Sequence, residues 1–137
     1  AGEPPKPLAK IASGGEISRV MLALKVGLAG RAGVPTLIFD EVDAGLGGRA
    51  AATVARKLDE LSRQNQVIVI SHLPQIAGRA TTHFRIDKVE RSGRSVTEIR
   101  ALNSDERVEE IARMLAGEHV TEPALANARA LLQPGLF

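Results

Sequence analysis

Two short, continuously apolar segments on either side of an amphipathic segment constrain the fold of this chain most strongly. They are residues 36–39 (Thr-Leu-Ile-Phe) and 67–70 (Val-Ile-Val-Ile), and runs of this kind are typical of strands buried on both faces. The segment between them, residues 49–64, predicts a helix. The apolar face of that helix is formed by Ala51, Val54, Leu58 and Leu61. A strand, a crossover helix and a second strand imply two parallel strands in one sheet.

The segments before and after this unit add a helix and a hairpin. Residues 16–29 predict a first helix, which Gly30 and Gly33 end. Its apolar positions are Ile17, Met21, Leu24 and Leu28. Residues 82–88 and 95–101 flank a turn at 91–94, which predicts a β-hairpin at an antiparallel edge.

Two closing helices are expected after the hairpin. The first covers residues 105–116, with Asn103 or Ser104 as its cap and Gly117 at its end. Its apolar face is formed by Val108, Ile111, Ala112 and Leu115. The second runs over residues 121–132. The predicted fold class is therefore α/β, a mainly parallel sheet flanked by helices, with a β-hairpin and two C-terminal helices.

The composition excludes several classes of protein. A chain of 137 residues with 44% hydrophobic and 25% charged content has the balance of one folded domain. The absence of cysteine excludes disulfide scaffolds and thiolate sites, and it fits a reducing compartment such as the cytoplasm. No apolar run approaches the roughly 20 residues of a membrane span, so no membrane partner is expected. With 2% aromatic residues, stacking platforms for single-stranded nucleic acid are nearly absent. A net charge of +2 does not by itself indicate a nucleic-acid-binding protein.

The residues Ser13, Gly14, Gly15 and Glu16 open the first predicted helix and have two interpretations. Serine at the cap and glutamate three residues later form a capping box, which satisfies two backbone N–H groups. Adjacent glycines also expose the backbone at a positive helix end, where N–H groups bind an anion such as a phosphate. Because a glycine in a helix costs about 1 kcal/mol relative to alanine, the pair favours the anion site.

Two carboxylates, Asp40 and Glu41, follow the first predicted strand. Ligands of open α/β sheets bind beyond the carboxyl ends of the strands, so these side chains stand where a site is expected. One carboxylate would hold Mg²⁺ while the other polarises a water for attack on a phosphoryl group. The alternative is that they are solvated turn residues. The glycine-rich loop over residues 43–48 would let a ligand or another subunit come close.

Ser71 and His72 follow the second predicted strand in the same way. A histidine at this edge can donate a hydrogen bond to a phosphate oxygen, or it can lie on the surface without a role. The other histidines, His83 and His119, have no partners at metal-ligand spacing.

Taken together, these segments resemble one family. Residues 12–16 (Ala-Ser-Gly-Gly-Glu) are similar to the signature motif of ABC-type ATPases, in the form found in the SMC-like branch. Residues 37–41 resemble a Walker B strand with its glutamate, 43–48 a D-loop, and His72 the switch histidine. Residues 2–11, 40–48 and 110–115 narrow the resemblance to the bacterial SMC-like ATPases of DNA double-strand-break repair.

The resemblance implies a role for each site residue. Asp40 would hold Mg²⁺, Glu41 would orient or deprotonate the attacking water, and His72 would contact the γ-phosphate of ATP. The residues implied to bind the nucleotide are Ser13, Gly14, Gly15, Glu16 and Asp43. The signature residues would close onto ATP bound by a second head, so that ATP joins two heads into a dimer. Gly47 departs from the family pattern, which has an aspartate there, and no role is assigned to it.

The family resemblance also implies what this chain lacks. Its heads combine this C-terminal lobe, residues 13–137, with an N-terminal lobe that carries the Walker A loop, and residues 1–12 would be a proline-rich linker from an upstream coiled coil. A Walker A loop needs a Gly-Lys pair, and none occurs in the sequence. The chain alone is therefore expected to be inactive. The expected partners are the Walker A lobe, a second head and, through the full protein, DNA, in a cytoplasmic, nucleoid-associated location.

Three alternatives remain at this point. The chain could be half of another ABC ATPase, such as a transporter subunit, although Glu16 stands where glutamine is usual. It could be a docking module without activity, although the site residues are intact. Finally, basic residues of the hairpin could contact DNA, or they could protect an exposed edge strand from aggregation, which is the favoured interpretation. These residues are Arg85, Lys88, Arg91, Arg94 and Arg100, interleaved with Asp87, Glu90 and Glu98.

Overall fold

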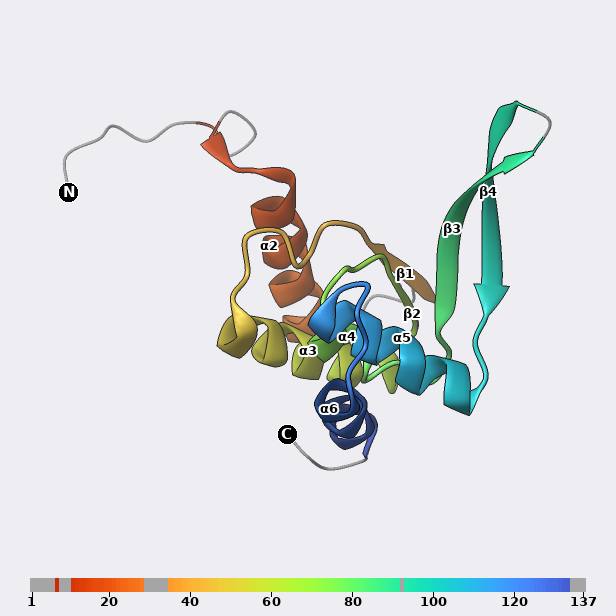
Figure 1. Ribbon diagram of the computed structural model, residues 1–137. Helices are drawn as coiled ribbons and strands as arrows, with labels where there is room; N and C mark the ends of the chain where they lie inside the picture. Colours follow the sequence, from red (N-terminus) through yellow and green to blue (C-terminus); the bar gives the residue numbers. More distant parts are fainter. Residues whose placement is uncertain (1–6, 8–10, 29–34, 92, 134–137) are drawn as a thin grey trace. The chain divides into compact units, whose positions relative to one another are not determined.

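The computed structural model describes residues 7, 11–28, 35–91 and 93–133 (Figure 1). The chain divides after His72 into two compact units, residues 1–72 and 73–137. The predicted linker over residues 1–12 lies almost entirely outside the described residues, as do Gly30 and Gly33. No helix within the described ranges is long and apolar enough to cross a membrane.

The first unit contains the predicted strand–helix–strand arrangement. Strand β1 is Thr36–Phe39 and strand β2 is Gln66–Val69, and the two pair in parallel with Ile38 opposite Ile68. Helix α3, Gly48–Ser62, connects them and buries Ala51, Leu58 and Leu61 of the predicted face together with Ala55, whereas Val54 is half-buried. The parallel pairing is therefore confirmed. The described part of this sheet has two strands.

Helix α2, Gly14–Gly27, begins two residues earlier than its apolar periodicity predicts. Ser13 is its cap, and the predicted capping box with Glu16 is present in full. Because the capping box fixes the first turn, the two glycines are already helical. The backbone N–H of Leu28, the C-cap residue, donates to the carbonyl oxygens of Leu24 and Val26.

The prediction that both strands are buried on both faces is wrong for the described chain. One face of the sheet is buried through Leu37 and Phe39, but the other face is open, with Ile38 67% exposed and Ile68 45% exposed. On α2 the buried apolar residue is Leu22. The apolar positions whose spacing predicted this helix are all exposed: Ile17, Met21, Leu24 and Leu28. Apolar periodicity identifies a face that needs a cover, and the described elements of this unit do not supply one.

The second unit contains the hairpin and the closing helices. Strands β3, Phe84–Arg91, and β4, Arg94–Ala101, pair in antiparallel register around a turn in which Gly93 has φ +73°. Helix α5, Ser104–Ala116, starts at a capping box between Asn103 and Glu106. It ends at Gly117, whose φ of +78° is a conformation that glycine adopts without strain.

Helix α6, Glu122–Leu132, packs against α5. Their shared core is made of small and branched side chains: Ile111, Ala112, Ala124 and Ala128. A short helix, α4 over Pro74–Ala77, was not predicted from the sequence and contacts α5. It is a single turn that starts at a proline, so it has no periodicity to detect.

Candidate functional site

The carboxyl ends of β1 and β2 bring two predicted motifs to one edge of the sheet. Pairing continues one step beyond the strands, where the backbone N–H of Ile70 donates to the carbonyl oxygen of Phe39 over 2.9 Å. Asp40 and Glu41 follow β1 directly, and Ser71 and His72 follow β2. Parallel strands end on the same side of a sheet, so the two loops that carry these residues meet.

The side chain that joins the two loops is Asp43. Its Oδ2 atom accepts from the Ser71 hydroxyl over 2.6 Å and from the His72 backbone N–H over 2.9 Å, and it lies 3.0 Å from Nδ1 of His72. The Asp43 side chain is 2% exposed, whereas that of His72 is 74% exposed. Burial raises the pKa of Asp43, but the hydrogen bonds from Ser71 and His72 outweigh it, and the pKa lies below its usual value.

The two glycines of the signature segment lie directly against the loop after β1. A Cβ atom on Gly14 would come within 2.8 Å of Glu41 Oε2, and one on Gly15 within 2.7 Å of the Ala44 side chain and 2.8 Å of the Glu41 carbonyl oxygen. Glu41 itself has φ +55°, a conformation that side-chain-bearing residues rarely adopt. Gly15 therefore has a role within this chain, because a larger residue there would have to displace the backbone of the loop, whereas a Cβ on Gly14 would meet only the flexible end of the Glu41 side chain.

Two residues that the sequence analysis did not select tie α2 to the same loop. Ser18 Oγ donates to the carbonyl oxygen of Asp40 over 2.8 Å. Arg19 Nη1 donates to the carbonyl oxygens of Ala44, over 2.8 Å, and Val42, over 3.4 Å. Ser18 follows Gly14 by four residues, and Arg19 follows Gly15 by four, so each pair lies on the same side of α2. This spacing is the sequence signal that could have identified the two residues.

Ser13 and Glu16 are engaged with each other. The Ser13 hydroxyl donates to Glu16 Oε2 over 3.0 Å, and the Ser13 backbone N–H donates to the same oxygen over 2.8 Å. These bonds, led by the backbone one, hold the pKa of Glu16 below its usual value. The capping-box interpretation of this segment is thus confirmed. Anion binding at the same helix start remains a prediction.

The carboxylates predicted to serve the metal and the water are both open to solvent. Asp40 and Glu41 are exposed, and the described residues hold no group of three side chains that would bind a metal ion alone. Mg²⁺ is commonly held by one or two carboxylates together with waters and substrate phosphates, rather than by a cage of protein ligands. An exposed aspartate at a sheet edge fits that mode of binding.

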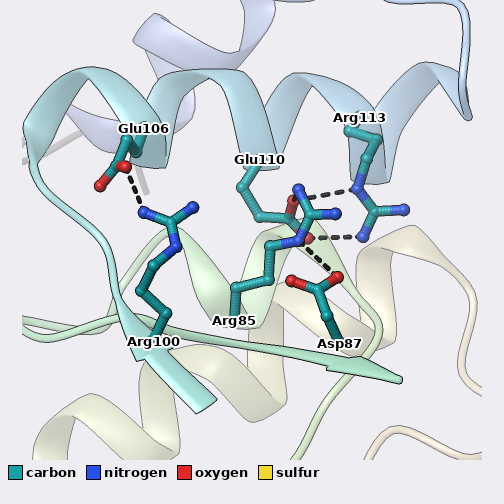
Figure 2. A network of polar contacts seen from close by, with 6 residues as sticks. All are labelled: Arg85, Asp87, Arg100, Glu106, Glu110 and Arg113. Atoms are coloured by element: carbon teal, nitrogen blue, oxygen red, sulfur yellow. Dashed lines mark hydrogen bonds and ion pairs between the residues drawn. The ribbon is translucent and has the colours of Figure 1, made fainter. Parts of the chain in front are cut away.

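The basic residues of the hairpin are largely paired with acids (Figure 2). Arg85 and Arg100 stand opposite each other in the register of β3 and β4, an arrangement that repels by itself. Each is paired on α5, Arg85 with Glu110 over 3.2 Å and Arg100 with Glu106. Arg91 pairs with Glu98 across the hairpin. These contacts favour a structural role for the hairpin charges.

Glu110 is the most buried member of this network. Its carboxylate also receives Arg113 at 2.6 Å, one turn further along α5 (Figure 2). Burial raises the pKa of Glu110, but the hydrogen bond from Arg113 and the charges of Arg113 and Arg85 outweigh it, so the pKa lies below its usual value. The hairpin and α5 are thereby held together by charge as well as by backbone connection.

Comparison with known proteins favours one family over the alternative of another ABC ATPase. No family model matches the chain. The DNA repair protein RecN of Halalkalibacterium halodurans is 56% identical over 131 residues, which cover 96% of this chain and 23% of that protein. RecN of Deinococcus radiodurans is 52% identical, and RecN of Bacillus subtilis 47%, each over 96% of this chain and 23% of the relative. This chain is a RecN-like segment. It spans about a quarter of the length of the RecN proteins that it matches.

A solved structure supports the same assignment at the level of the fold. It comes from work on ATP-driven dimerization and DNA-stimulated activation of SMC ATPases, and it aligns with a TM-score of 0.58 over 87% of this chain and 71% of that chain, at 24% identity. The α/β lobe of an SMC-type ATPase head, predicted from the motifs, is thus confirmed as the fold of the RecN-like segment. The recognition of an SMC-like repair family is likewise confirmed by the RecN relatives.

Proposed function

We propose that this RecN-like chain is the C-terminal lobe of an SMC-like ATPase head that binds and hydrolyses ATP at a head–head interface in DNA double-strand-break repair and recombination. The observation that carries the proposal is the single sheet edge at which Asp40, Glu41 and His72 gather, with the signature glycines directly against Glu41. The similarity to RecN over 96% of the chain supports the biological setting.

In the proposed reaction each residue of the edge has a separate role. Glu41, which is exposed, would orient the attacking water and accept its proton. His72, whose side chain is largely in solvent, would contact the γ-phosphate. Asp40 would hold Mg²⁺, whose charge offsets the charge that builds up on the transferring phosphoryl group. These roles do not overlap, so each can be removed separately.

The signature segment would serve a second site. Ser13, Gly14, Gly15 and Glu16 form the start of α2, where the positive end of the helix attracts phosphate, although the N–H groups of Ser13 and Glu16 are engaged in the capping box. We propose that this surface closes onto ATP bound by the opposite head. Asp43 is buried, so its part in nucleotide binding would be indirect.

The exposed apolar surfaces of the first unit support a partner lobe. Parallel strands are ordinarily covered on both faces, but one face of the β1–β2 sheet is open, and so is one side of α2. The chain also spans only 23% of its relatives, which leaves ample sequence for a Walker A lobe to supply the cover. The lobe would complete both the core and the phosphate site. DNA contacts and the cytoplasmic, nucleoid-associated location would belong to the full protein.

Mixing the lobes tests this proposal. The chain alone should not hydrolyse ATP, and addition of a Walker A-bearing lobe of the same protein should restore hydrolysis. A mixture with a Walker A lobe whose loop lysine is replaced serves as the control and should stay inactive. Hydrolysis by the chain alone would contradict the split-head arrangement.

The substitution Glu41→Gln tests the role of the base. In the complete head it should leave ATP binding intact and slow hydrolysis by about 100-fold or more, because a general base contributes on that scale. Heads should accumulate as ATP-bound dimers, seen by size-exclusion chromatography. The matched variant Glu60→Gln, on α3 where the half-buried Glu60 pairs with Lys57, should hydrolyse ATP at the normal rate. Normal turnover by Glu41→Gln would show that the base is a different group.

A further inference from the structure

We propose that Asp43 is a positioning residue that acts on the reaction through His72. The proposal rests on the function proposed above, in which His72 contacts the γ-phosphate, and it changes the role of Asp43 from contact with nucleotide to control of the residue that makes the contact. The juxtaposition that carries it is Asp43 Oδ2 at 3.0 Å from the Nδ1 atom of the His72 ring.

The geometry leaves Asp43 with no access to a ligand of its own. Its side chain is 2% exposed, and Oδ2 receives three groups from the loop after β2: the Ser71 hydroxyl, the His72 backbone N–H and the His72 ring. An ionised carboxylate accepts several hydrogen bonds at once, whereas a neutral amide oxygen accepts fewer and more weakly. The negative charge of Asp43 is therefore what holds this loop and the ring together.

The contact also decides which atom of His72 is available. A ring nitrogen that points at a carboxylate carries its proton there, so Nδ1 is the donor toward Asp43. This leaves Nε2, on the far side of an exposed ring, as the atom that meets a ligand. When both nitrogens are protonated, Nε2–H donates to a phosphate oxygen while Asp43 balances the positive charge of the ring. Asp43 thus fixes the orientation of the His72 ring and which of its nitrogens faces a ligand.

Of the three contacts to Asp43 Oδ2, two hold the loop in place, and only the contact with the His72 ring would distinguish a positioning role from a structural one. The bonds from Ser71 and from the His72 backbone would hold the loop whatever side chain stood at position 72. Only the ring contact depends on the imidazole. A purely structural Asp43 would therefore affect turnover equally with or without the histidine, and this difference can be measured.

A double-mutant cycle in the full-length protein tests the proposal. We expect Asp43→Asn to lower the kcat for ATP by about ten-fold or more, with KM changed less than about two-fold, and His72→Ala to lower kcat at least as much. In the His72→Ala background, Asp43→Asn should have no further effect on kcat. The control Ser71→Ala removes one structural donor to the same oxygen and should keep kcat within about two-fold. Equal losses of kcat from Asp43→Asn in both backgrounds would overturn the proposal.

The outcomes also separate this proposal from the function on which it rests. If neither His72→Ala nor Glu41→Gln lowers ATP hydrolysis, the proposed function fails and the role of Asp43 fails with it. If both lower hydrolysis and Asp43→Asn leaves kcat at the normal value, only the positioning role fails.

A second measurement does not depend on the folding of Asp43→Asn. In full-length protein labelled with ¹⁵N-histidine within this segment, which has three histidines, the ring nitrogens of His72 are identified by their loss in His72→Gln. We expect Nδ1 to be protonated and coupled to a slowly exchanging hydrogen. A ring in which only Nε2 carries hydrogen would overturn the proposal.

Discussion

The two units of the chain differ in how far each one completes its own structure. In the second unit, α5 and α6 bury Ile111 and Ala128 completely, and charge pairs join the hairpin to α5. In the first unit, Asp43 joins the loops that follow β1 and β2, but the side chains of Ile38 and Leu24 are exposed. The difference fits our proposal that another lobe completes the first unit.

The largest expected effect comes from the core of the second unit. Ile111→Ala should lower the free energy of unfolding by about 3 kcal/mol, because Ile111 is fully buried and the cavity left behind cannot be filled by water. Urea denaturation followed by circular dichroism measures the change.

The matched variant Leu24→Ala, on the exposed side of α2, should change that free energy by less than about 0.5 kcal/mol and should instead weaken binding to the Walker A lobe. A large loss of stability in the isolated chain from Leu24→Ala would contradict the view that this face awaits a partner.

The next effect concerns the contact between α2 and the loop after β1. Gly15→Ala places a Cβ 2.8 Å from the backbone of Glu41, so the loop has to shift, at a cost of about 1–3 kcal/mol. Thermal unfolding of the chain measures this cost, and hydrolysis by the assembled head should fall with it. Gly48→Ala, where a Cβ meets nothing within 4 Å, is the control for stability and should leave the thermal unfolding of the chain nearly unchanged. Equal tolerance of the two substitutions would show that the close approach is not required.

The smallest effect depends on pH and tests the charge network of the second unit. Glu110→Gln should cost about 1–2 kcal/mol at pH 7, since Arg85 and Arg113 lose an ionised partner but keep access to water. The pKa of Glu110 is lowered in the folded state, so its stabilisation is present above the usual pKa of a glutamate and is lost as the pH falls through the lowered value. The stability difference between wild type and Glu110→Gln should therefore shrink between pH 7 and about pH 3. A difference that does not change with pH would contradict the network.

Local patterns in the sequence predicted the elements of both units well. The capping boxes at Ser13 and Asn103, the parallel pairing of β1 with β2, and the hairpin all follow from residue types at fixed spacing. The order of motifs also placed Asp40 and His72 at the same edge of the sheet, because parallel strands end together.

Features that depend on the path of a loop could not be predicted in this way. The contact of Asp43 with His72 requires residues 41–43 to turn inward, and that turn uses a positive φ at Glu41, which no residue type at this position signals. The exposure of Ile38 was not predicted for a different reason. An apolar run indicates that a strand is buried, but it does not indicate which element or chain packs on each of its faces. Sequence patterns therefore predict helices, strands and caps, whereas contacts between loops depend on the tertiary structure.

The hydrogen bonds from Ser18 and Arg19 end on main-chain oxygens, of Asp40 in one case and of Val42 and Ala44 in the other. Every residue type offers that acceptor, so the attachment of the loop to α2 does not depend on which side chains the loop carries. These bonds therefore persist when the side chains of the loop change, whereas a change at Ser18 or Arg19 removes them. The side chains of the loop are constrained separately, by contacts such as those of Asp43 with Ser71 and His72.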